Sequence, residues 1–198
     1  MTMTSTIATA PRVLADALPG ARVRDVLLTL GATGLLIAAG QIAVPLPFTP
    51  VPLSLATFVV LLAGASLGPV RAASSVLLYL ALGLAGIPVF ADHAAGWAFA
   101  SFGYILGYLA SSVLVGYLAR RRADRSLLGG LAIGGLGTLA VYACGVPWLA
   151  AFAGLDLPAA LALGVLPFLI GDALKIAVVA VALPTTWRLG AGRLSGRR

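Results

Sequence analysis

The sequence predicts an all-α, polytopic integral membrane protein with six transmembrane helices in one domain. Composition is the first observation: of 198 residues, 61% are hydrophobic and only 10% are charged. Soluble domains carry about 25% charged residues and about 45–50% apolar ones. The second observation is the set of uncharged stretches, which cover 26–70, 72–91, 93–119 and 126–155. A helix needs about 20 apolar residues to cross the hydrocarbon core of a bilayer.

The N-terminal part of the chain predicts an arm followed by two spans. Residues 1–25 are polar, and we expect them to form a mobile or interfacial arm. The next apolar block is too long for one span, and four prolines interrupt it in the sequence VPLPFTPVP. Proline lacks a backbone donor and disrupts helices. We therefore place a loop at 45–52, between the first and second spans.

Glycine, proline and charge mark the remaining boundaries. The sequence GPVR at 68–71 is a short connection, the third span ends before Pro88, and RRRADR at 120–125 follows the fourth. We expect the last span to end at Pro184, followed by a basic tail over 185–198. The six expected spans, which together make a membrane domain over 26–184, cover residues 26–44, 53–67, 71–87, 98–118, 128–148 and 159–184.

The arginines are confined to one side of this topology. All twelve lie in the N-terminal arm, in the connections after the second and fourth spans, and in the tail, whereas the three opposite loops contain none. Positively charged loops stay in the cytoplasm, so we expect both termini to be cytoplasmic in a multi-pass protein of the cell membrane. Orientation also accounts for the net charge of +7. It removes the reason to expect a nucleic-acid partner and leaves the lipid bilayer.

Two charged residues, Asp172 and Lys175, lie in the middle of the last expected span. Asp172 is about 20 Å along the axis from Ala159, where a charge costs about 2.5–3.5 kcal/mol or more. Residues three apart share a helix face. One interpretation is an ion pair that only locks the bundle. The other is a receptor for a small polar solute, in which Lys175 faces an anion, Asp172 accepts hydrogen bonds and Gly171 permits close approach.

Four segments carry a resemblance to a known family. They are PLPFTPVPLSLATFVVLLAGASLGP (45–69), LLYLALGLAGIPVFA (77–91), FGYILGYLAS (102–111) and GVLPFLIGDALKIAVVA (164–180). In this order they resemble the BioY family, the biotin-specific substrate-binding S components of energy-coupling factor transporters. The resemblance implies a six-helix membrane bundle that binds biotin tightly. It also implies a transmembrane coupling subunit and two ATP-binding-cassette ATPases as partners, with no cofactor, metal or catalytic residue in this chain.

The resemblance further implies a set of pocket residues. The candidate substrate-binding residues are Asp172, Lys175, Gly171, Tyr104, Gly103, Phe90, Tyr79 and Ser101. Trp97 is added to them because it neighbours the loop before the fourth span and is placed to close over a ligand. Biotin carries a carboxylate, a ureido group with two N–H donors and one acceptor, and an apolar ring and chain. One cation, one carboxylate and an aromatic wall suit these groups of biotin. Lys175 is suited equally to the carboxylate and to the ureido oxygen.

Gly34 and Ala38 lie four residues apart in the first expected span. Small residues at this spacing serve packing inside membrane bundles, and the resemblance implies the alternative of docking to the coupling subunit. Three other functions stay open: an S component for another small vitamin, an intramembrane hydrolase, and a structural subunit. A hydrolase needs paired aspartates or a nucleophile with a base. Here only Asp172 lies within a span, and the single histidine, His93, is expected in a loop.

Overall fold

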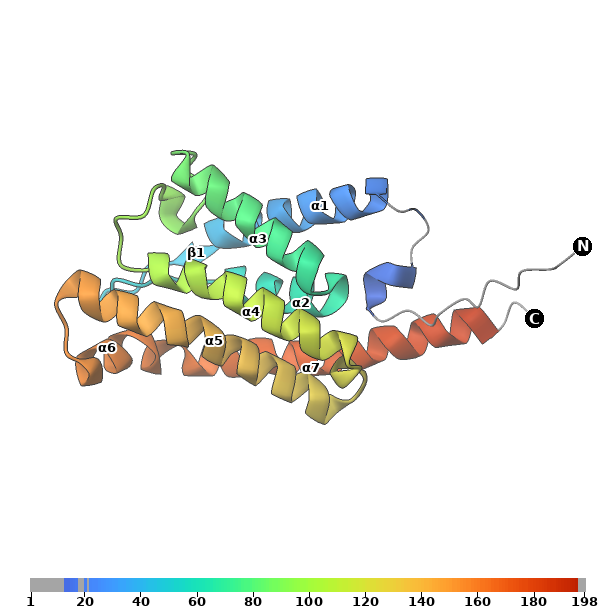
Figure 1. The fold of residues 1–198 in the computed structure, drawn as a ribbon. Coiled ribbons are helices and arrows are strands. Elements are labelled where there is room, and N and C mark those ends of the chain that lie inside the picture. The colour runs from blue at the N-terminus through green and yellow to red at the C-terminus, as the bar shows by residue number, and fades with distance from the viewer. Residues whose placement is uncertain (1–12, 18–19, 21, 196–198) are drawn as a thin grey trace, which may run out of the picture.

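The computed structural model describes residues 13–17, 20 and 22–195, which form a helical bundle with a short ribbon at one end (Figure 1). The helices are α1 (Arg22–Gln41), α2 (Ala56–Leu67), α3 (Pro69–Leu84), α4 (Phe102–Arg120), α5 (Leu127–Ala153), α6 (Leu157–Gly164) and α7 (Leu169–Ser195). Strands β1 (Ala43–Val44) and β2 (Leu53–Ser54) pair antiparallel as the ribbon. Four 3-10 turns complete the elements of the described part of the chain: η1 (Leu14–Ala17), η2 (Ala91–His93), η3 (Ala123–Arg125) and η4 (Leu166–Phe168).

The structure confirms a mostly helical membrane protein. Among the described residues, four helical stretches are long and apolar enough to cross a membrane, and they cover Arg22–Gln41, Phe102–Arg120, Leu127–Ala153 and Leu157–Leu189. Helices α2 and α3 are also apolar, but they contain only 12 and 16 residues. Gly68, with a φ of 81°, turns the chain sharply between them, a conformation that glycine adopts without steric cost.

The last expected span, 159–184, is not one helix. Helix α6 ends at Gly164, the turn η4 contains Pro167, and α7 begins at Leu169. A proline suits the entry to a helix, because its missing N–H has no helical partner there anyway. The sequence prediction was wrong in treating this proline as part of a continuous span.

The predicted helix end at Pro184 was also wrong, because α7 continues through this proline to Ser195. The hydroxyls of Thr185 and Thr186 donate to the carbonyls of Val181 and Ala182, at 2.7 and 2.8 Å. Threonine hydroxyls of this kind help membrane helices to tolerate an internal proline by binding carbonyl groups near it.

The N-terminal segment joins the bundle earlier than expected. Helix α1 begins at Arg22, and Val13 is fully buried in a cluster of apolar side chains. The expectation of a mobile or interfacial arm over 1–25 is therefore corrected for 13–17, which pack against the helices, and for 22–25, which form the start of α1. Its remaining part over 1–12, 18, 19 and 21 lies outside the described residues.

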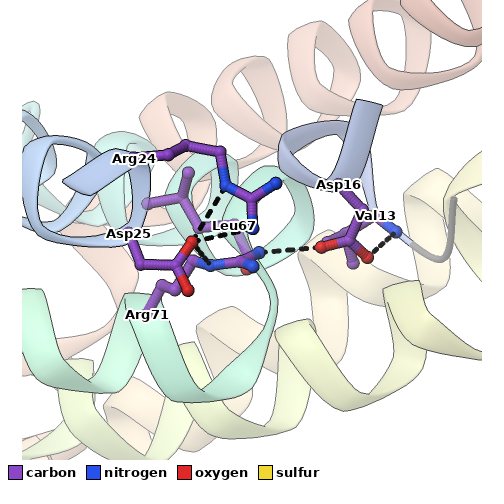
Figure 2. A network of polar contacts seen from close by, with 6 residues as sticks. All are labelled: Val13, Asp16, Arg24, Asp25, Leu67 and Arg71. Atoms are coloured by element: carbon purple, nitrogen blue, oxygen red, sulfur yellow. Dashed lines mark hydrogen bonds and ion pairs between the residues drawn. The ribbon is translucent and has the colours of Figure 1, made fainter. Parts of the chain in front are cut away.

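A network of ion pairs holds this segment in place (Figure 2). The guanidinium of Arg71, at the start of α3, lies 2.9 Å from Oδ1 of Asp16 and 2.9 Å from Oδ1 of Asp25. Arg24 pairs with the same oxygen of Asp25 at 2.9 Å. Arg71 thus joins η1, α1 and α3, and the two arginines are matched by two carboxylates.

Helices α4 and α5 form the most extensive helix pair of the bundle, because glycines lie along their interface. A Cβ atom added to Gly103 would lie 2.1 Å from Cβ of Trp148, and one added to Gly107 would lie 2.7 Å from Cα of Val141. Both distances are well below van der Waals contact, so no larger residue fits. Small residues of this kind let membrane helices approach closely, and the two backbones meet along this seam.

A buried aspartate lies in the connection between α4 and α5. Asp124 is fully buried, and its Oδ2 accepts a hydrogen bond from the indole N–H of Trp187 in α7. Its Oδ1 has no hydrogen-bond partner among the described residues. The guanidinium carbon of Arg125 lies over the Trp187 ring, 4.1 Å from its centroid. Burial raises the pKa of the Asp124 carboxyl, and the indole hydrogen bond opposes this rise only in part.

We predict that Asp124→Asn stabilises the protein at high pH. Above its raised pKa the native carboxylate is charged and desolvated, which costs free energy, whereas below it the neutral acid resembles the amide. The rise in melting temperature should therefore be largest near pH 9 and disappear at low pH, in detergent. Asp124→Leu should lower the melting temperature, because it removes the acceptor of Trp187. If the difference in melting temperature between Asp124→Asn and the wild type does not change with pH, the charge of Asp124 is not its cause.

Candidate ligand-binding site

A cavity lies between the helices at the end of the bundle that carries the β1–β2 ribbon. It contains about 640 Å³ of space free of protein atoms, including its opening to solvent. The centres of water-sized molecules can reach only about 50 Å³ of it. Its polar lining residues are Ser54, Thr57, Tyr79, Ser101, Tyr104, Tyr108, Thr138, Tyr142, Asp172 and Lys175. Val51, Ile105, Val141 and Phe168 are among the apolar ones.

Asp172 and Lys175 lie together on one wall of this cavity. Nζ of Lys175 is 3.0 Å from Oδ1 of Asp172, and the hydroxyl of Tyr142 donates to Oδ2. The side chains of the aspartate and the lysine are only 10% and 11% exposed. Buried charges persist when they are paired and hydrogen-bonded. The prediction that these two side chains point into one interior space is confirmed.

The break between α6 and α7 determines the surroundings of Asp172. The sequence placed this residue about 20 Å into a continuous span, but it lies in the first turn of α7. Backbone N–H groups of a first helical turn lack helical acceptors, and the helix dipole makes this end partly positive. Both effects favour a carboxylate at this position. Transporters with discontinuous membrane helices place such helix ends at their substrate sites.

Tyr79, Tyr104 and Ser101 also line the cavity, as the sequence predicted. The hydroxyl of Tyr104 donates to the carbonyl of Gly164 at 2.9 Å. Its ring packs so closely on Gly145 that an added Cβ would lie 2.5 Å away. One hydrogen bond and one glycine contact therefore fix this aromatic wall.

The other four predicted site residues do not line the cavity. Gly103 packs against α5, and Gly171 faces the ribbon. Phe90 is fully buried, with its ring centroid 5.0 Å from that of Tyr79 in an edge-on contact. Trp97 is 61% exposed at the end of the bundle. The structure gives Phe90 a supporting position behind Tyr79, rather than a place in the cavity wall.

Sequence reasoning missed three polar lining residues on α4 and α5. Tyr142 holds Asp172, and Tyr108 lies with its hydroxyl beside those of Ser54 and Thr57. Thr138 is 7% exposed, and its hydroxyl has no hydrogen-bond partner among the described residues. Thr138 and Tyr142 are four apart on α5, so the sequence does place them on one face.

A buried hydroxyl without a partner is unusual and costs free energy. Because the hydroxyl of Thr138 belongs to the cavity wall, it is available to hydrogen-bond a molecule that enters the cavity.

Two connections between the helices contribute to the cavity wall. Val51 lines it from the expected 45–52 loop, and Ala91 lines it from η2. The hydroxyl of Thr49 donates to the carbonyl of Leu163 at 2.7 Å and so ties the first connection to α6. The amide of Gln41 donates to the carbonyl of Phe90 at 2.9 Å and ties the second connection to α1.

We predict different stabilities for two substitutions on α5 in the ligand-free protein. Tyr142→Phe removes a donor from a buried carboxylate and should lower the free energy of unfolding by about 1–3 kcal/mol. Thr138→Val replaces an unpartnered hydroxyl with a methyl group of the same shape, so it should be neutral or stabilising. Melting temperatures in detergent check both. An equal loss in the two variants would contradict the unpartnered state of Thr138.

Comparison with known proteins extends this description. The BioY family model matches residues 8–192. The chain is 38% identical over 136 residues to a probable biotin transporter BioY of Pyrococcus horikoshii, covering 67% of this chain and 78% of that protein. It is 33% identical over 171 residues to the biotin transporter BioY of Rhizobium etli, covering 80% and 90%. It is 34% identical over 176 residues to that of Rhodobacter capsulatus, covering 82% and 92%.

A solved structure shares the fold. The crystal structure of the S-component for biotin from an ECF-type ABC transporter superposes with a TM-score of 0.76 at 28% sequence identity. The match covers 84% of this chain and 92% of that one. With the family match over most of its length, the chain belongs to the BioY family.

Proposed function

We propose that this protein is the biotin-binding S component of an energy-coupling factor transporter in the cell membrane. Its relatives are named as biotin transporters, and the solved structure that shares its fold is an S component for biotin. The observation that carries the proposal is the Asp172–Lys175 pair on the wall of a buried cavity. An ionisable pair at membrane depth is a functional site by default.

The chemistry of the cavity suits biotin. A ureido N–H can donate to Asp172, whose oxygens keep acceptor capacity beside Lys175 and Tyr142. Lys175 then satisfies either the ureido oxygen or the carboxylate. The hydroxyl of Thr138 supplies one further hydrogen bond from α5, and the ring of Tyr104 packs against the apolar parts of the ligand.

The same proposal includes six spans and cytoplasmic termini. The first residue of α1 and the last of α7 lie at one end of the bundle, with η3 and the connection between α2 and α3 (Figure 1). All described arginines lie on segments at this end, and the ribbon end has none. The positive-inside rule supports a cytoplasmic location for the arginine-bearing end. Helices α2 and α3 then complete the six spans.

Uptake requires partners in this proposal. Gly34 and Ala38 are exposed on α1, and a Cβ atom added to Gly34 would meet nothing within 4 Å. These small residues therefore do not serve packing within the bundle, which supports the alternative of a docking face for a partner helix. We assign this face to the transmembrane coupling subunit, with two ATPase subunits supplying the energy.

We predict that purified wild-type protein binds biotin and that Asp172→Asn and Lys175→Met each weaken binding at least 100-fold. Each substitution leaves the retained partner without its counter-charge in a buried site. Equilibrium binding of labelled biotin in nanodiscs measures the effect. Asp92→Asn is the matched control: Asp92 is exposed in a left-handed conformation that asparagine also adopts, and binding should not change.

Three outcomes separate the alternatives. If folded wild type ignores biotin but binds another vitamin in a panel, the specificity for biotin is wrong. If the wild type binds biotin and both charge variants bind equally well, the ion pair only locks the bundle. If no small molecule binds at all, a structural role replaces transport.

We predict that Gly34→Leu and Ala38→Leu leave biotin binding unchanged but reduce co-purification with the coupling subunit at least tenfold. Both side chains would project from an exposed face, so the bundle itself should tolerate them. Ala81→Leu, on an exposed position of α3, is the control for added bulk. Undiminished assembly of the α1 variants would place the docking face elsewhere.

A further inference from the structure

The outward face of α4 carries an apolar groove that the proposed transport function does not use. It is lined mainly by Leu106, Leu109, Ala110, Val113 and Tyr117 of α4 and by Pro69 of α3. Val113 and Tyr117 are 45% and 48% exposed, so this face of the bundle is open to the surroundings. Gly116 brings the two helices together beside the groove, because an added Cβ would lie 2.4 Å from the nitrogen of Pro69.

The length of the groove matches one leaflet of a bilayer. From Leu106 to Tyr117 the helix rises about 16 Å, and half of a hydrocarbon core of about 30 Å is about 15 Å. Tyr117 lies at the end of the groove nearest the arginines. Aromatic residues with a polar tip are enriched at this depth, where the hydrocarbon meets the headgroups.

Positive charge is concentrated at that same end. The guanidinium carbon of Arg121 lies 4.5 Å from the centroid of the Tyr117 ring, and an N–H of the same guanidinium group donates to the Tyr117 hydroxyl. Arg120 lies beside the α2–α3 turn, with its Nε 3.4 Å from the position of a Cβ on Gly68. Arg120, Arg121 and Arg122 are all exposed, and none of them forms an ion pair with a carboxylate among the described residues.

We propose that this groove binds an anionic phospholipid. One acyl chain lies along α4 over Ala110 and Val113, and the phosphate contacts the guanidinium groups of Arg120 and Arg121. Arginine is suited to this contact because its planar fork donates two hydrogen bonds to one phosphate. A basic surface at the end of an apolar, leaflet-deep groove complements both parts of such a lipid. The orientation of the termini does not enter this inference.

Native mass spectrometry of delipidated protein tests the proposal. Phosphatidylglycerol and phosphatidylcholine with identical acyl chains would be added in equal amounts. We expect the wild type to retain phosphatidylglycerol at least fivefold better, and Arg120→Gln/Arg121→Gln to lose this preference. Ala110→Phe, which fills the groove, should reduce retention of both lipids. Arg22→Gln, at another exposed position of the same end, and Ala81→Phe are the matched controls, and melting temperatures confirm that every variant is folded.

Four results would overturn the proposal. Equal retention of the two lipids by the wild type removes the headgroup site. An equal loss in Arg22→Gln shows only a general effect of net charge. Displacement of phosphatidylglycerol by inorganic phosphate at millimolar concentration points to a soluble anion. Unchanged lipid retention by the α4 variants, with loss of co-purifying coupling subunit, assigns the arginines to a protein partner.

Discussion

The cavity depends on accommodating one buried carboxylate, that of Asp172, inside an apolar bundle. Asp172 has three sources of stabilisation: the ammonium group of Lys175, the hydroxyl of Tyr142 and the N-terminal end of α7. The third source exists only because the chain breaks before α7. The helix dipole places partial positive charge in the first turn of α7, which contains Asp172. Pro167, in the η4 turn that precedes α7, thus acts on the site indirectly, through the position of this break.

The polar groups around the cavity fall into two kinds. Tyr104 and Asp172 have protein partners, and these partners fix their orientation before any ligand arrives. Thr138 has none among the described residues. Groups that already have protein partners determine the shape of the site. A group without a partner strengthens the binding of a ligand that reaches it, because the new hydrogen bond removes a desolvation cost. Affinity and shape thus come from different residues.

The sequence predicts the fold and the site to different depths. Composition and charge-free lengths are properties of the chain itself, so the helical membrane protein and most of its helices follow directly from them. Asp172 and Lys175 also follow, because a charge within an apolar span is conspicuous wherever it lies. Tyr142 does not: a tyrosine on a mostly apolar helix is ordinary until tertiary packing brings it to Asp172.

Two errors have a local physical origin. Proline is compatible with a helix entry and, in membranes, with a helix interior. The sequence alone therefore does not distinguish Pro167, in the turn that precedes α7, from Pro184, which lies inside α7. The packing of Val13 depends on Arg71, some sixty residues away, which binds both η1 and α1. Polar composition near a terminus gives no indication of such a distant partner.

The glycine seam between α4 and α5 has a consequence for how the cavity admits its ligand. Where two backbones already touch, neither helix can slide or rotate without collision, since interiors packed at this density deform little. Helices α4 and α5 therefore form a rigid side of the cavity. We therefore expect the cavity to widen on the opposite side. There, the hydrogen bond from Thr49 to Leu163 holds the connection across β1 and β2 to α6. One side of the cavity is therefore rigid, and the hydrogen bond of Thr49 holds the side that can move.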